Sequence, residues 1–70
     1  MSVADLVRMA NQIAANQSYL AADEASQAVA THIAAFWTPA MRRELAEAVD
    51  AGTAQLDEVA LSAIRQLQPA

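Results

Sequence analysis

The sequence predicts an all-α protein, a compact bundle of four short helices that forms one domain over residues 1–70. A single glycine and two prolines leave few residues that break helices. Alanine, the strongest helix former, supplies 19 of the 70 residues. In four segments, apolar residues recur every three or four positions, as on the buried face of a helix. Packing alone must stabilise the bundle, because the chain has no cysteine and domains of this size are only marginally stable.

The first helix is expected over residues 3–17. Ser2 and Asp5 have the spacing of a capping box, with aspartate in place of the usual glutamate or glutamine. The apolar residues of this segment fall on one face: Val3, Leu6, Val7, Ala10, Ile13 and Ala14. Polar residues occupy the opposite face, so the helix is amphipathic.

The second helix is expected over residues 23–36, after a connection at residues 16–22 in which the helical period is lost. Tyr19 and Leu20, within this connection, are expected to pack against the core. The most apolar face of the second helix consists of Ala25, Val29, Ile33 and Phe36. Alanines surround this face on nearly every side, which predicts a central position for the helix in the bundle.

The third helix is expected over residues 39–51. Thr38 is a suitable N-cap, and Pro39 suits the first helical turn while holding Thr38 in the extended conformation that a cap adopts. Gly52 is expected to end the helix. The positions expected to be buried are Met41, Leu45, Ala48 and Val49.

The fourth helix is expected over residues 57–67, with Asp57 as its cap and Pro69 as its stop. Its core positions are Leu56, Ala60, Ala63, Ile64 and Leu67. Val59 and Leu61 project to either flank and widen the apolar arc to about half the circumference of the helix. This stripe is wider than a small bundle needs, which suggests a contact surface for another polypeptide.

Composition excludes several classes of function. Four arginines against eight acidic residues give a net charge of −4, which disfavours nucleic acid as a partner. Without cysteine and with one histidine, the chain lacks the usual ligands of a metal site. No apolar run approaches the length of a membrane span, and the first residues lack the basic-then-apolar order of a signal peptide. We therefore expect a cytoplasmic protein with no membrane partner.

The titratable residues form no recognisable catalytic constellation. His32 is the only histidine, and no carboxylate is placed to orient it. We therefore interpret it as a residue at the core edge or at a subunit interface rather than as a general base or a metal ligand. Helix capping and solvation explain the acidic pairs, which are Asp23 with Glu24, Glu44 with Glu47, and Asp57 with Glu58. We assign no catalytic, cofactor-binding or metal-binding residue.

Arg42 is the most informative charged residue. Arg8 and Arg43 each have an acidic residue three or four positions away, whereas Arg42 has none. It also lies close to the positive end of the third helix, where a cation is mildly disfavoured. One interpretation is that Arg42 binds an acidic group of a partner. The other is a solvated side chain that lies over Trp37, with cation–π character.

The adjacent aromatic residues Phe36 and Trp37 are expected to point in different directions, because neighbours on a helix differ by about 100°. If Phe36 points into the core, Trp37 does not. Trp37 then acts as a lid between the second and third helices or as an anchor for a partner. The two roles are compatible, because they use different faces of the ring.

Two sequence blocks carry a resemblance to a known family. LVRMANQIA at residues 6–14 and HIAAFWTPAMRREL at residues 32–45, followed by LDEVALSAIRQL, resemble the delta subunit of NAD-dependent formate dehydrogenases that contain molybdenum or tungsten. The order, spacing and rare Trp-x-Pro core make the two blocks specific in combination. The chain departs from the family pattern in lacking an aromatic pair after the first block, and in having Thr38 where many members have aspartate and Ala40 where many have arginine.

The resemblance implies a non-catalytic subunit of a hetero-oligomer that oxidises formate to CO2 and reduces NAD+. In such enzymes the large subunit carries the bis-pterin molybdenum or tungsten cofactor and iron–sulfur clusters, and another subunit carries FMN. The implied role is to dock on the large subunit and to stabilise it or assist its assembly. The residues expected at the interface are His32, Trp37, Arg42, Arg43, Val59 and Leu61.

The sequence also allows two other classes of function to be compared with this role. A free-standing helical regulator could form a homodimer through the fourth helix, in which case a stable symmetric dimer would exist without a larger partner. A small independent enzyme is disfavoured, because no acid, base or nucleophile constellation is present to perform a reaction.

Overall fold

The computed structural model describes residues 1–68, which fold into four α-helices without a strand. The helices are α1 (Val3–Asn16), α2 (Ala22–Phe36), α3 (Pro39–Asp50) and α4 (Glu58–Leu67). The all-α prediction is therefore confirmed, and every observed helix end lies within one residue of its expected position. The expected stop at Pro69 lies outside the described residues. No helix in residues 1–68 is long and apolar enough to cross a bilayer.

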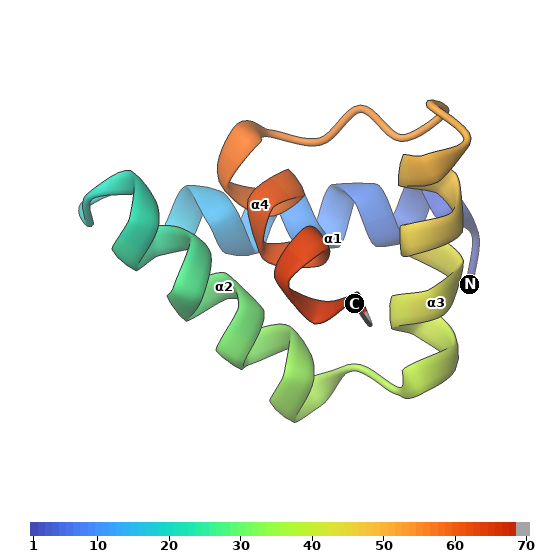
Figure 1. The fold of residues 1–70 in the computed structure, drawn as a ribbon, viewed down its shortest axis with the longest axis horizontal. Coiled ribbons are helices and arrows are strands. Elements are labelled where there is room, and N and C mark those ends of the chain that lie inside the picture. The colour runs from blue at the N-terminus through green and yellow to red at the C-terminus, as the bar shows by residue number, and fades with distance from the viewer. Residues whose placement is uncertain (69–70) are drawn as a thin grey trace.

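Helix α4 occupies the centre of the fold (Figure 1). It packs against α1, α2 and α3, whereas α2 and α3 diverge from the turn that joins them and make little contact. The expected central position of the second helix is therefore wrong. Its outer face, which includes Thr31, Ala34 and Ala35, is exposed. The reason is that small residues on α4, Ala60 and Ala63, allow neighbouring helices to approach that helix closely.

The predicted N-caps are confirmed. Both hydrogen bonds of the capping box join Ser2 and Asp5 at the start of α1. Thr38 Oγ1 accepts a hydrogen bond from the backbone N–H of Met41 at 3.2 Å, at the start of α3. The Asp57 carboxylate accepts one from the N–H of Val59 at 3.1 Å, at the start of α4. These local bonds explain why three helix starts were predictable from sequence.

Gly52 ends α3, as predicted. Its φ of 75° lies in the left-handed region that favours glycine. The N–H of Gly52 donates to the carbonyl of Val49, and the N–H of Thr53 donates to the carbonyl of Ala48, both at 3.0 Å. This pair of bonds is a Schellman motif, which satisfies carbonyls that the helix leaves free.

The core is built from one or two large side chains of each helix, surrounded by alanines. The largest fully buried side chains are Leu6, Val29, Ile33, Leu45 and Ile64. Trp37 is 5% exposed and belongs to the same cluster, whereas Phe36 is 74% exposed. The expectation that Phe36 points into the core is therefore wrong. Because α2 ends at Phe36 and Trp37 has an extended backbone, the indole turns back into the core instead of following the helical rotation.

Two further expectations are corrected. Tyr19 is 79% exposed and does not pack against the core, because consecutive turns at the end of α1 are held by their own backbone bonds, such as Leu20 N–H to Gln17 O at 3.1 Å. Trp37 does not hold Arg42 in a cation–π pair among residues 1–68, because its ring is buried in the core cluster.

Asn11 links α1 to the connection between α3 and α4, which the sequence analysis did not foresee. Its side-chain amide donates to the carbonyl of Gln55 at 3.1 Å. Its side-chain oxygen accepts from the N–H of Asp57 at 2.8 Å. These two bonds span more than forty residues of sequence and hold the start of α4 against α1.

Candidate docking surface

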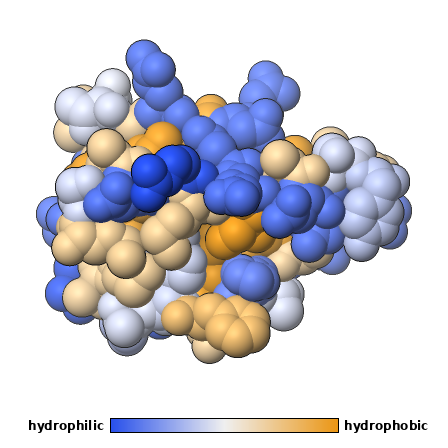
Figure 2. Space-filling view, turned by 180° about the vertical axis from the view of Figure 1, so that it is seen from behind, coloured by the Kyte–Doolittle hydropathy of each residue, from blue (hydrophilic) through white to orange (hydrophobic). Residues whose placement is uncertain are grey.

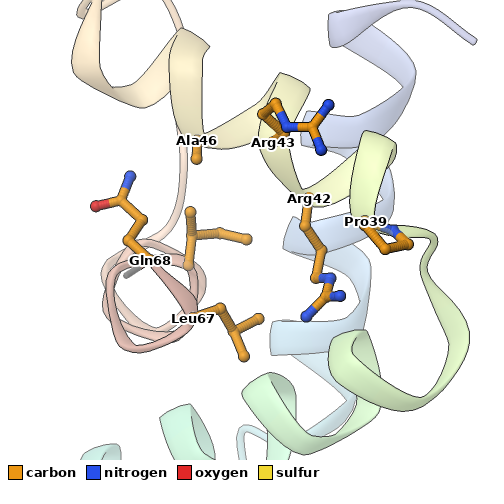
Figure 3. Close-up of a pocket in the computed structure, with 7 residues that line it drawn as sticks. Pro39, Arg42, Arg43, Ala46, Leu67 and Gln68 are labelled. Carbon is orange, nitrogen blue, oxygen red and sulfur yellow. The ribbon is translucent and has the colours of Figure 1, made fainter. Parts of the chain in front are cut away.

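Two surface features flank the turn that joins α2 to α3. The first, the arginine hollow, is a depression of about 280 Å³ between α3 and α4 (Figure 3). The second, the aromatic patch, lies where α1 passes the C-terminal end of α2. The buried Trp37 anchors the turn between them, so both features border the packed core.

The arginine hollow has apolar walls and a cationic group. It is lined by Pro39, Arg42, Arg43, Ala46, Ile64, Leu67 and Gln68. In Figure 3, the side chains of Arg42 and Leu67 extend into the space between α3 and α4, whereas the guanidinium of Arg43 points away from them. The hollow therefore presents one guanidinium beside aliphatic side chains.

The side chain of Arg42 has no polar partner within residues 1–68. Its Nε is buried and makes no hydrogen bond. The described residues contain one ion pair, between Arg8 and Asp5 at 3.2 Å, as expected from the sequence, whereas the pair that the sequence also allowed for Arg43 is not formed. Leaving a buried donor unsatisfied costs about 1–3 kcal/mol. The structure therefore favours neither a local salt bridge nor a stacked position on Trp37 for this side chain.

The aromatic patch combines exposed and half-buried apolar side chains. The rings of His32 and Phe36 lie 4.7 Å apart between centroids, tilted by 40°. Both are exposed, and the half-buried Met9, Ile13 and Met41 line the same depression. On the face seen in Figure 2, apolar side chains gather between hydrophilic ones. An exposed aromatic ring beside other apolar groups is typical of a contact site.

The six residues expected at an interface are divided by the fold. His32 belongs to the aromatic patch, Arg42 and Arg43 line the arginine hollow, and the buried Trp37 lies between the two features. Val59 packs against the core, and Leu61 is half-buried in a separate shallow depression of α4. The wide apolar stripe of α4 is thus used mostly inside the fold, because α4 is central.

Phe36 is a surface residue that was not predicted from the sequence. The signal that was available is the proline two positions beyond Trp37, which already required extended backbone between the helices. Extended backbone at Trp37 breaks the helical relation between the two aromatic residues. This break explains why Trp37 does not follow the helical rotation from Phe36.

The titratable groups in residues 1–68 show no arrangement typical of catalysis. These residues contain no cluster of three or more side chains suited to hold a metal ion. Hydrogen bonds from the side chain and backbone of Ser2 lower the pKa of Asp5, and the charge of Arg8 makes a smaller contribution in the same direction. This perturbation belongs to the cap of α1 and not to a reactive site.

Residues 5–64 match the family described as the NADH-dependent formate dehydrogenase delta subunit FdsD. The matched range contains both sequence blocks that carry the resemblance, at residues 6–14 and 32–45. No curated protein and no solved structure matches the chain.

Proposed function

Because the chain belongs to the FdsD family of NADH-dependent formate dehydrogenase delta subunits, we propose that it is a non-catalytic subunit that docks on the large subunit of the enzyme. The proposed role is structural: docking stabilises the large subunit or assists its assembly. Binding to the folded partner stabilises it by mass action, without any chemistry in this chain.

In this proposal the reaction occurs on other subunits, in the cytoplasm. The large subunit would carry the bis-pterin molybdenum or tungsten cofactor and iron–sulfur clusters, and another subunit would carry FMN. The composition of this chain is consistent with that division, because it has no cysteine to ligate a cluster and one glycine, too few for a nucleotide-binding loop.

One observation carries the proposal: the second sequence block, residues 32–45, supplies residues to both surface features. It contributes His32 and Phe36 to the aromatic patch and Arg42 to the arginine hollow. A partner that covers the turn between these features would contact an exposed aromatic ring and an unpaired cation at once. Such a combination of an aromatic anchor and an arginine is characteristic of protein interfaces.

Co-purification tests the proposal. The full chain carries an affinity tag and is expressed in its own cells together with the other formate dehydrogenase subunits. We expect the large subunit to co-purify in a fixed ratio. A tagged chain that is folded and abundant but brings down no large subunit would refute the proposal.

A matched pair of variants locates the surface. Phe36 and Tyr19 are both exposed aromatic residues, but only Phe36 lies in the aromatic patch. Phe36→Ala should reduce the amount of co-purified large subunit several-fold, whereas Tyr19→Ala should leave it unchanged. Equal effects of the two variants would exclude the aromatic patch as the contact.

A further inference from the structure

We infer that the arginine hollow is a recognition pocket for an acidic side chain, an aspartate or glutamate, that the partner subunit inserts between α3 and α4. This inference rests on the proposed function, and it names the chemistry of the contact. The acidic side chain would meet the guanidinium of Arg42 in the pocket and place apolar neighbours against its aliphatic walls.

The guanidinium of Arg42 is an unpaired cation. The Arg42 side chain makes no hydrogen bond and no ion pair within residues 1–68, and its Nε is already withdrawn from solvent. Part of the cost of desolvating the guanidinium is therefore incurred before any partner arrives. A carboxylate that binds the free terminal nitrogens in a bidentate manner would gain a charge-assisted contact in a partly shielded site.

The pocket is suited to a carboxylate rather than to a phosphate group. Phosphate sites use several backbone N–H groups at a helix start. At the start of α3, Pro39 has no N–H, and the amides of Met41 and Arg42 are bonded to the side chain and carbonyl of Thr38. One planar guanidinium suits a planar carboxylate better than a tetrahedral anion.

The walls of the hollow are largely apolar. Ile64, Leu67, Ala46 and Pro39 line a volume of about 280 Å³, far more than one carboxylate fills. A small free anion would leave these apolar walls in water. A protein segment that carries the carboxylate on an apolar stem, with an apolar neighbour, would cover them. The occupant is therefore a side chain of a folded partner.

The local charge of the pocket would also make docking specific. The chain has a net charge of −4, so an acidic partner surface is repelled by most of this molecule. Arg42 and Arg43 form a local positive site on it, and an acidic side chain would be directed there. The pocket would therefore fix the orientation of docking as well as its strength.

Competitive incorporation tests the inference even if the enzyme assembles only when this subunit is present. Wild-type chain and one variant are co-expressed with the other subunits, the complex is purified through a tag on the large subunit, and intact-mass spectrometry measures the ratio of the two chains. Arg42→Gln should be depleted by about tenfold or more relative to its ratio in the lysate. Arg65→Gln removes the same charge from an exposed residue of α4 that does not line the hollow, and should be depleted less than about twofold.

A second variant keeps both arginines. Ala46→Leu fills the hollow and should also be depleted, while circular dichroism of the isolated chain should show an unchanged helical content. Incorporation of Arg42→Gln at parity with wild type would overturn the inference and leave the proposed function standing. Absence of the wild-type chain from the complex would overturn both. A homodimer of the isolated chain that Arg42→Gln dissociates, with incorporation unchanged, would assign the pocket to a second copy and overturn the inference.

Discussion

The unpaired side chain of Arg42 should lower the stability of the isolated chain, although the proposed contact with the partner requires it. A buried Nε without a partner costs free energy in the isolated subunit, so replacing it with an apolar side chain of similar shape should be favourable. We predict that Arg42→Met stabilises the isolated chain by about 1 kcal/mol. Thermal unfolding followed by circular dichroism measures this. A destabilised variant would mean that the guanidinium is satisfied in solution.

The two adjacent aromatic residues have opposite roles. Trp37 fills the core beneath the turn, so Trp37→Ala should cost about 3–5 kcal/mol and leave much of the isolated chain unfolded. Phe36 is largely exposed, so Phe36→Ala should change the free energy of unfolding by about 0.5 kcal/mol or less. Urea titrations of both variants compare these costs. A larger loss of unfolding free energy for Phe36→Ala would mean that its ring packs in the core.

These residues also mark the limit of prediction from sequence. The absence of a local partner for Arg42 is visible in the sequence, because helical neighbours are three or four positions away. The hollow around Arg42 is not, because its opposite wall comes from α4, more than twenty positions along the chain. The exposure of Phe36 was not predicted, because its place on the apolar face of the helix does not show where along that face the core ends.

Helix ends were predictable because their determinants are local. Ser2, Thr38 and Asp57 act within three residues, and Gly52 supplies a backbone conformation that other residues rarely adopt. Which helix occupies the centre depends on contacts between distant segments. The alanine content of α2 therefore did not predict which helix is central. The wide apolar stripe of α4 was the better indicator, although it was interpreted as an outer contact surface.

The capping box of α1 predicts a pH dependence. The pKa of Asp5 is lowered from its ordinary value of 3.8, so its ionised form is stabilised by folding. This contribution is complete above the pKa of the unfolded chain and is lost as pH falls through the lower pKa of the folded chain. Melting temperatures measured from pH 6 downward should fall less steeply below pH 4 in Asp5→Asn than in wild type. Identical pH profiles would contradict this role for the cap.

The link between α1 and the α3–α4 connection rests on Asn11. Asn11→Ala removes both hydrogen bonds and should cost about 1–3 kcal/mol, because two backbone groups lose their partners. Hydrogen exchange should accelerate at residues 53–58. Asn16→Ala is the control, since Asn16 lies exposed at the end of the same helix. If both variants exchange alike, the link does not hold the connection.

In the whole molecule, the four short helices position the turn between α2 and α3. The arginine hollow lies on one side of this turn and the aromatic patch on the other. The molecule measures 28 × 22 × 20 Å, so a partner surface of ordinary size would cover a large share of one side. The family match and this arrangement together favour a subunit whose contribution is shape and surface. The account therefore predicts that one side of the chain faces the rest of the enzyme.

Site-specific photocrosslinking in the assembled enzyme tests this claim most directly. A benzophenone amino acid replaces Phe36 in one preparation and Tyr19 in another, and mass spectrometry identifies the crosslinked peptides after irradiation. The account predicts crosslinks to the large subunit from position 36 and few or none from position 19. Crosslinks from position 19 alone, or from neither position in an enzyme that contains the chain, would contradict it.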